Sequence, residues 1–593
     1  HALRFGAEWN RIDQFVFAAF FGLAPRVLSR RNTATRAFAN TNPFSPQGDL
    51  DPLNYPVQQI VLGNGLGFFS EKPALGFPFG GTTNDRLAFY LHDIWRVKDT
   101  FTLNFGLRYT YHTALSNHDL PRAPLVGLFD QRLVGRPRRD TDDFGPTAGF
   151  AWNVLGNNKL VVRGGAGIYY ETNIFNNILF DRVINIPPGI GFDVSVNTSG
   201  FPFVLDPVTG NVLFDFSTDC IGLPGNNCFN GSIGQAIPFA VQAQQLYQQA
   251  SAAATANFPS GDPLFNATLD GTDLINPDYH TPYGAHMNIG FQWEIKTGLV
   301  LSTDYVRNRG VHFNLIHDWN RIGAADTLNI PLAQAAIAAT LNDFGCPDID
   351  CVIALGGTIS DFADRGLGAG AGVDGFAFSG RNPNFRNMGV ISPQGLSLFQ
   401  ALQVRLTGDV GAFEQFGIRR LFTNITYQLG RFESTGADQD FLSTAAFNDR
   451  PTQFFGPANL DRTHMVSVSF VADLPWNFTI SMNNTFRSAL ANSLFLPATT
   501  GGADEIFFSD WNGDGITQDP IFGSNRGSFS RDIKANDIND VISRWNSTFA
   551  GTLSPAARAL VQAGLFTEAQ LQALGAVLTS VQPAPAGQVN NDS

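Results

Sequence analysis

Charge is scarce in this sequence, and long hydrophobic runs are missing. Only 15% of the 593 residues are charged, yet the mean hydropathy is near zero at −0.04. No apolar run approaches the ~18 residues that a membrane-spanning helix needs, which excludes a helical membrane protein. The net charge of −13 argues against nucleic-acid binding, because phosphate contacts require a basic surface.

Cysteine is also scarce, with four residues in two local pairs, Cys220 with Cys228 and Cys346 with Cys351. Both pairs lie in sequence rich in Gly, Pro, Asn and Asp, where loops are expected. An even count in paired loops predicts two disulfides formed in an oxidising compartment. Metal binding is the alternative, but no histidine or third cysteine is nearby, so disulfides are favoured.

Aromatic residues and glycine are abundant, with 54 phenylalanines and 60 glycines. This composition suits long antiparallel strands whose aromatic side chains lie at a lipid–water boundary. Composition alone also fits a secreted β-rich protein with a large aromatic core. The pattern along the chain separates these two possibilities.

The clearest pattern spans Tyr283 to Ile295, where every odd-numbered residue is apolar and every even-numbered one is glycine or polar. A period of two gives a strand one apolar face and one polar face. After a short turn at 296–298, a second alternating run returns through 299–305. Each arm exceeds the ~9–11 residues that a tilted strand needs to cross a bilayer.

The same alternation recurs along the chain. Further strands are expected at 3–10, 86–96, 101–112, 144–155, 159–171, 397–407, 417–429, 463–473 and 477–487. Short turns alternate with long connections, which is how outer-membrane barrels are built. We therefore predict an all-β fold, a single transmembrane antiparallel β-barrel over 1–593 with short periplasmic turns. Extracellular loop regions are expected at 23–85, 172–280, 310–395 and 488–593.

Small helices are expected inside these loops. The sequence predicts helices over 240–256 and 331–341, and a helical pattern over 530–580. In that last region Ser554 and Pro555 form a helix start, and Thr567 with Gln570 forms a capping box.

The polar strand positions are expected to face the barrel lumen. The candidates are Arg108, Arg163, Glu171, His286, Glu294 and Arg405. Contact with a solute, lining of a lumen and packing against a plug all account for them. Their apolar counterparts, including Phe105, Phe150, Ile289 and Phe470, are expected to face lipid.

One stretch has the spacing of a calcium loop. Oxygen ligands are placed as in the first half of such a loop by Asp510, Asn512, Asp514 and the backbone carbonyl of Ile516, with Gly515 at the turn. Ile521 stands where a bidentate glutamate is expected, so Asp519 would have to replace it. The alternative is a surface turn held by side-chain-to-backbone bonds. We expect a structural Ca²⁺ that braces an external loop.

Enzymatic chemistry has no support in the sequence. Gly370 to Gly375 matches G-x-G-x-x-G but follows no strand and opens no helix, so a flexible loop is favoured. Asp461 and His464 are read as a hydrogen-bonding pair at the barrel rim. No G-x-S-x-G, H-E-x-x-H or P-loop motif occurs, so we expect no enzyme activity and no required cofactor.

Several segments resemble the barrel of TonB-dependent outer-membrane receptors, particularly the Oar-like branch. They are YLHDIW (90–95), FTLNFGLRY (101–109), TPYGAHMNIGFQWEI (281–295), DYVRNRGVHF (304–313), ALQVRL (401–406) and LDRTHMVSVSF (460–470) with DLP (473–475). The resemblance implies uptake of a large solute, such as a peptide, a glycan or a metal chelate. It also implies TonB as a partner through a plug, contact with lipid, and residence in a Gram-negative outer membrane with extracellular loops.

The sequence departs from this family at both ends. Nothing before His1 supplies a plug or a TonB box, and the last residues, 588–593, lack a terminal aromatic strand. We expect the sequence to be an internal portion of a longer protein. A surface adhesion or structural barrel without transport is the alternative function.

Overall fold

The computed structural model describes most of the chain, with gaps that fall between the main strands. The described residues are 1–14, 24–29, 51–63, 82–120, 122, 126–127, 129–171, 178, 181, 193–197, 202–206, 209, 211–253, 274–372, 375–383, 387–413, 417–436, 443–444, 448, 450–453, 455–522 and 535–585.

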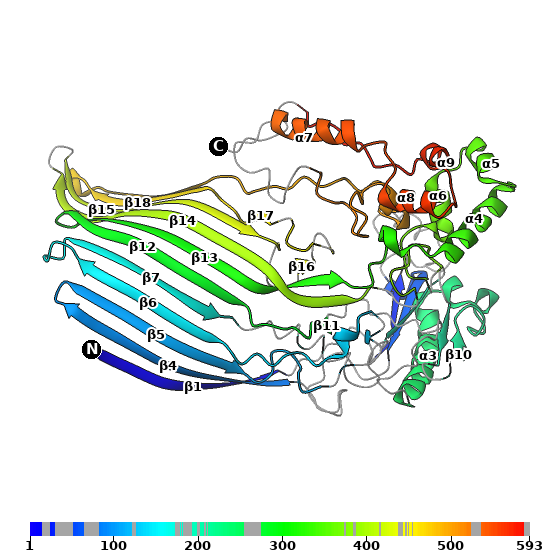
Figure 1. The fold of residues 1–593 in the computed structure, drawn as a ribbon, viewed down its shortest axis with the longest axis horizontal. Coiled ribbons are helices and arrows are strands. Elements are labelled where there is room, and N and C mark those ends of the chain that lie inside the picture. The colour runs from blue at the N-terminus through cyan, green and yellow to red at the C-terminus, as the bar shows by residue number, and fades with distance from the viewer. Residues whose placement is uncertain are drawn as a thin grey trace.

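A large antiparallel sheet dominates these residues (Figure 1). Its main path follows chain order through β1 (Ala2–Gln14), β4 (Thr82–Lys98), β5 (Phe101–His112), β6 (Phe144–Asn153), β7 (Leu160–Tyr170), β12 (Tyr283–Lys296), β13 (Leu299–Asp318), β14 (Gly389–Phe413), β15 (Ile418–Ser434), β18 (His464–Asp473) and β19 (Thr479–Arg487). Each of these strands pairs with the next one along the path. The predicted fold class is confirmed.

Short and long connections alternate along the sheet, as predicted. Short turns at 99–100, 154–159, 297–298 and 474–478 lie at one end of the sheet, while the helices gather at the other end (Figure 1). Gly298 fits the tight turn between β12 and β13 because its φ of +79° is unfavourable for other residues. A Cβ there would also lie 2.7 Å from the carbonyl oxygen of Asp409.

Several strands extend further into the long connections than predicted. β4 begins at Thr82, β13 continues to Asp318 and β14 begins at Gly389, so the expected loop bounds of 23–85 and 310–395 are too wide. Past Val311 the pairing of β13 with β14 continues through irregular register shifts. Those shifts break the strict alternation from which the bounds were read.

The register places the apolar strand positions on one face. Phe105 pairs with Ala148, two residues from Phe150, and Gly164 pairs with both Phe150 and Ile289. Directly paired residues share a face, and the ladders through β13, β14 and β15 bring Phe470 to the same one. We call this the apolar face and its opposite the polar face.

The apolar face is exposed rather than packed into an interior. Phe105 and Ile289 are 41% and 51% exposed, and neither belongs to a cluster of buried apolar side chains among the described residues. Other large exposed residues of this face are Phe5, Trp9, Phe89, Leu91, Leu107, Trp152, Met287, Trp293, Leu402 and Ile480. Such an area in contact with water would be strongly unfavourable, so it is the surface that contacts lipid.

Aromatic side chains mark both boundaries of the apolar face. Trp95, Trp152 and Trp293 lie toward the short turns. Toward the long connections, the rings of Tyr170 and Tyr283 are 5.6 Å apart and those of Tyr109 and Phe144 are 4.8 Å apart. These two belts are those expected at the lipid–water interfaces.

The sheet is open in the described residues. Within this part of the chain β1 pairs only with β4, and β19 pairs only with β18. Each of these outer strands therefore has one edge without a described partner.

The first loop module joins two long connections. A small sheet of β2 (Arg26–Ser29), β3 (Val57–Gly63) and β8 (Asp193–Asn197) packs near the hairpin of β9 (Phe203–Leu205) and β10 (Val212–Asp215) and the helix α3 (Ile233–Ala253). Its apolar core contains the predicted Cys220–Cys228 disulfide, fully buried. α3 begins earlier than the expected 240–256, because Ser232 and Gln235 cap its start.

The second module joins the β13–β14 connection to the C-terminal segment. Its apolar core is shared by α4 (Ile330–Phe344), α5 (Ile349–Ala354), α6 (Ile359–Phe362), α8 (Pro555–Gln562) and α9 (Glu568–Ala573). The Cys346–Cys351 disulfide links α4 to α5. The Ser554 cap and the Thr567–Gln570 capping box form as predicted. No helix in the described part of the chain, α7 (Ala535–Thr548) included, is long and apolar enough to span a bilayer.

A charge introduced at the same membrane depth is expected to destabilise the protein on the apolar face but not on the polar face. Ile289→Arg puts a guanidinium on the apolar face near mid-strand, and we expect a loss of about 2–4 kcal/mol in the free energy of unfolding. The neighbouring substitution Asn288→Arg puts the same group on the polar face, and we expect it to change the free energy of unfolding little. Denaturant titration of the protein in lipid vesicles measures both, and equal losses would contradict this assignment of the faces.

Candidate functional site

Ion pairs connect neighbouring strands across the polar face. Glu8 of β1 accepts from Arg86 at 2.6 Å and from Arg108 at 2.7 Å. Arg163 of β7 pairs with Asp304 of β13 at 3.0 Å, across the intervening strand β12. Charges on this face are thus paired laterally around the sheet.

The other predicted lumen-facing residues have separate surroundings. Arg405 donates to Asn424 at 2.9 Å, and the His286 ring packs edge-on against Tyr169 at 5.1 Å. Glu294 accepts from the backbone N–H of Gly298 at the short turn, and Glu171 lies just beyond the end of β7. The six residues therefore form a spread polar lining, not a single cluster, and their contact with a solute stays a prediction.

A concavity of about 480 Å³ lies over β4 to β7. Its polar-face residues include Arg4, Tyr90, His92, Arg108, Thr147 and Tyr169. Sequence reasoning found only Arg108 among them. The others also occupy polar-face positions of their strands, but only the pairing of distant strands shows that they converge.

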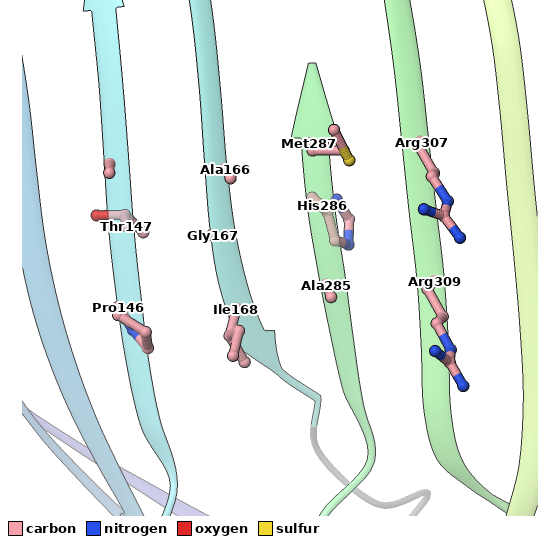
Figure 2. A pocket seen from close by; sticks show the side chains of 11 residues that line it. Pro146, Thr147, Ala166, Gly167, Ile168, Ala285, His286, Met287, Arg307 and Arg309 are labelled. Atoms are coloured by element: carbon pink, nitrogen blue, oxygen red, sulfur yellow. The ribbon is translucent and has the colours of Figure 1, made fainter.

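A second concavity, of about 440 Å³, lies mainly on the apolar face (Figure 2). Small side chains at Ala148, Ala166 and Ala285 hollow the surface there, and Met287 borders it. Arg307 and Arg309 stand beside it on β13, two residues apart (Figure 2). Because this face contacts lipid, the hollow is not a solute site.

The 510–519 loop forms a dense network of side-chain-to-backbone bonds. Asp510 Oδ2 accepts from the N–H of Gly515 at 3.0 Å, and Asp514 Oδ1 accepts from that of Ile516 at 2.9 Å. Asn512 Oδ1 accepts from the N–H of Asp514 at 2.9 Å. Asp519 accepts from the N–H of Trp511 at 3.1 Å. These bonds give the turn described as the alternative to a calcium loop.

The same loop is buried inside the loop region rather than on its surface. Burial and the charge of Asp514 raise the pKa of Asp510 to about 8, and burial also raises the pKa of Asp519. Ile521 is fully buried in an apolar cluster, so no carboxylate can take its position. Calcium binding here stays a prediction.

Two further sequence candidates have structural roles. Gly370 and Gly372 pack so closely against Phe376 and Pro383 that a Cβ would lie 2.2 and 2.4 Å from them. The described residues of 370–375 thus form a closely packed loop, and the flexibility of this loop stays a prediction. Asp461 accepts from the N–H of Phe432 at 2.6 Å, while His464 bonds to the Tyr427 hydroxyl at 2.8 Å.

The solved structures that match this chain include outer-membrane transporters and receptors. The outer membrane transporter YddB from Escherichia coli is 11% identical, with a TM-score of 0.36 over 71% of this chain and 35% of that one. The siderophore receptor PirA from Acinetobacter baumannii is 13% identical, with a TM-score of 0.31 over 76% and 43%. The FrpB iron transporter from Neisseria meningitidis is 8% identical, with a TM-score of 0.30 over 82% and 40%.

The chain thus spans less than half the length of these structures. No curated protein matches it. A family model described as an outer membrane beta barrel domain matches residues 1–494, which is most of the chain. The chain belongs to this outer membrane beta barrel family, and the outer membrane is its location.

Proposed function

We propose that the protein is an outer-membrane receptor of the TonB-dependent type, which takes up a solute too large for porins. The observation that carries this proposal is the combination of an ion-paired polar face with packed, disulfide-braced loop modules at one end of the strands. A binding surface needs loops that hold their shape, because ordering a flexible loop upon binding costs affinity.

In the proposed mechanism the polar face contacts the solute inside the barrel. Arg108, Tyr90 and Tyr169 line one concavity and offer a guanidinium and two phenol groups to a solute. These groups suit peptides, glycans and metal chelates alike. The family resemblance of the strand segments supports the remaining step, in which TonB moves a plug at the expense of the proton gradient.

A surface adhesion or structural barrel is the second candidate function. The same braced loops would then bind a partner without transport. Dependence of uptake on the proton gradient separates the two functions.

The uptake test uses cells that carry the complete gene and three labelled probes: a peptide, an oligosaccharide and a ferric chelate. We expect at least one probe to accumulate, and a protonophore to abolish its accumulation. Surface binding without accumulation would favour adhesion. Accumulation that persists with the protonophore would contradict TonB dependence.

Arg108→Ala tests the role of the polar face in the same assay. We expect about a tenfold lower uptake of an anionic probe, because one charge-assisted hydrogen bond contributes about 1.5 kcal/mol. Arg420→Ala is the matched control, since it also breaks an exposed ion pair, with Asp409 at 2.6 Å, but near a short turn. Equal uptake by the two variants would show that Arg108 does not contact the solute.

A structural Ca²⁺ in the 510–519 loop is a separate part of the proposal. It is supported by the oxygen spacing and by three buried carboxylates, Asp510, Asp514 and Asp519, whose combined charge favours a cation. We expect about 1 mM calcium to raise the melting temperature of the wild type by more than that of Asp510→Asn. Thermal unfolding in detergent measures both melting temperatures. An equal rise in the two proteins would show that Asp510 binds no calcium and that the loop is a hydrogen-bonded turn.

A further inference from the structure

Three acidic residues lie where the β5–β6 connection returns to the sheet. Asp140, Asp142 and Asp143 immediately precede β6. The segment just before β12, with Tyr279 and Thr281, crosses beside them, and the N–H of Thr281 donates to Asp140 Oδ2 at 2.6 Å. Two connections that are far apart in the sequence therefore meet at this point of the barrel rim.

The three carboxylates converge. Each offers an oxygen atom, and these atoms lie within 4.8 Å of one another. Within the described residues, this is the single group of three or more acidic, histidine or cysteine side chains that meets such spacing. Asp142 is exposed, while Asp143 is only 2% exposed.

Buried oxygen atoms at this place have no hydrogen-bond partner. They are Asp140 Oδ1, Asp143 Oδ1, Thr281 Oγ1 and the Tyr279 hydroxyl. Thr281 and Tyr279 are each 1% exposed. The Thr281 hydroxyl lies beside both buried carboxylates, yet it forms no hydrogen bond of acceptable geometry. A buried polar atom left unpaired costs about 1–3 kcal/mol. Asp140 Oδ1 has an ion-pair contact with Arg138 at 3.4 Å, whereas the other three atoms call for a missing partner.

A small cavity separates these groups. Asp140, Asp143, Tyr279 and Thr281 line it, and its volume is about 10 Å³. That volume holds about one water-sized sphere. His112 and His118 also line the cavity, but their ring nitrogens bond to Asn84 at 3.0 Å and to Arg139 at 2.8 Å.

The local charge is unbalanced. Arg138 is 2.9 Å from Asp142 and 3.4 Å from Asp140, so one guanidinium faces three carboxylates. Arg139 lines the cavity too, but its guanidinium is directed to His118.

We propose that Asp140, Asp142, Asp143 and Thr281 bind a calcium ion at the rim of the barrel. The donor atoms are all oxygen, which selects a hard cation over zinc or copper. Calcium tolerates an irregular set of ligands, whereas magnesium demands octahedral geometry and keeps several waters, for which this cavity has no room. The Tyr279 hydroxyl completes the wall of the cavity.

The ion joins the two connections above the membrane. The backbone of Asp143 already accepts from Thr110 of β5 at 3.0 Å, and Arg138 N–H donates to Pro277 at 2.7 Å. Calcium adds a link between 140–143 and 279–281 that does not depend on either disulfide. This inference concerns loop order and holds whether or not the protein transports a solute.

Amide hydrogen exchange of the whole chain in detergent tests the proposal, with CaCl₂ as the probe and MgCl₂ as the comparison. We expect calcium to slow exchange in 129–143 and 274–282. In an Asp140→Asn/Asp143→Asn variant the calcium concentration needed should rise by about 100-fold, because two of three ligand charges are lost. Asp278→Asn, an exposed carboxylate of the same segment, is the matched control and should behave as the wild type.

Three results would overturn the assignment. One is exchange in wild-type 129–143 that calcium does not change, a measurement that needs no variant to fold. Another is a double variant that responds at the wild-type calcium concentration. The third is slowing by MgCl₂ but not by CaCl₂. Calcium binding to the 510–519 loop would change exchange in peptides other than 129–143 and 274–282, so the two sites are measured separately.

Discussion

The structure depends on one constraint, that backbone N–H and C=O groups in hydrocarbon must bond to each other. In a sheet this demand is met between strands, which leaves side chains to alternate between lipid and lumen. Ile289 and Asn288 are adjacent in sequence, yet the register sends one to the apolar face and the other to the polar face. The period of two in the sequence is a direct consequence of this constraint.

The constraint ends where the strands leave the lipid, and a different principle governs the loops. There, long connections must bury their own apolar surface to hold a shape. They do so in pairs: α3 packs against strands from the first connection, and α8 and α9 share a core with α4. Neither partner in such a pair could build the core by itself. Disulfides between close cysteines then stabilise single connections, while the shared cores join different ones.

Sequence could therefore predict the strands, the faces and the local caps, because each depends on neighbours within a few residues. The capping box of Thr567 and Gln570 is such a case. Sequence could not predict that Glu8 meets Arg108, or that Thr281 meets Asp140, because those contacts follow from the pairing of distant strands. The irregular pairing of β13 beyond Val311 also made the strand longer than the alternation in the sequence indicated. Candidate sites in loops are the least predictable for this reason.

The same constraint bears on the outer strands of the sheet. β1 and β19 each present one edge without a partner in the described residues, and an unpaired edge in lipid costs several kcal/mol for each backbone group. Phe5 and Ile480 show that both strands carry lipid-facing side chains, so their free edges also lie at membrane depth. A protein in lipid satisfies such edges by closing its sheet into a barrel. Closure of a sheet encloses its polar face and separates ion pairs on that face from lipid, which is the condition under which they can line a path for a solute.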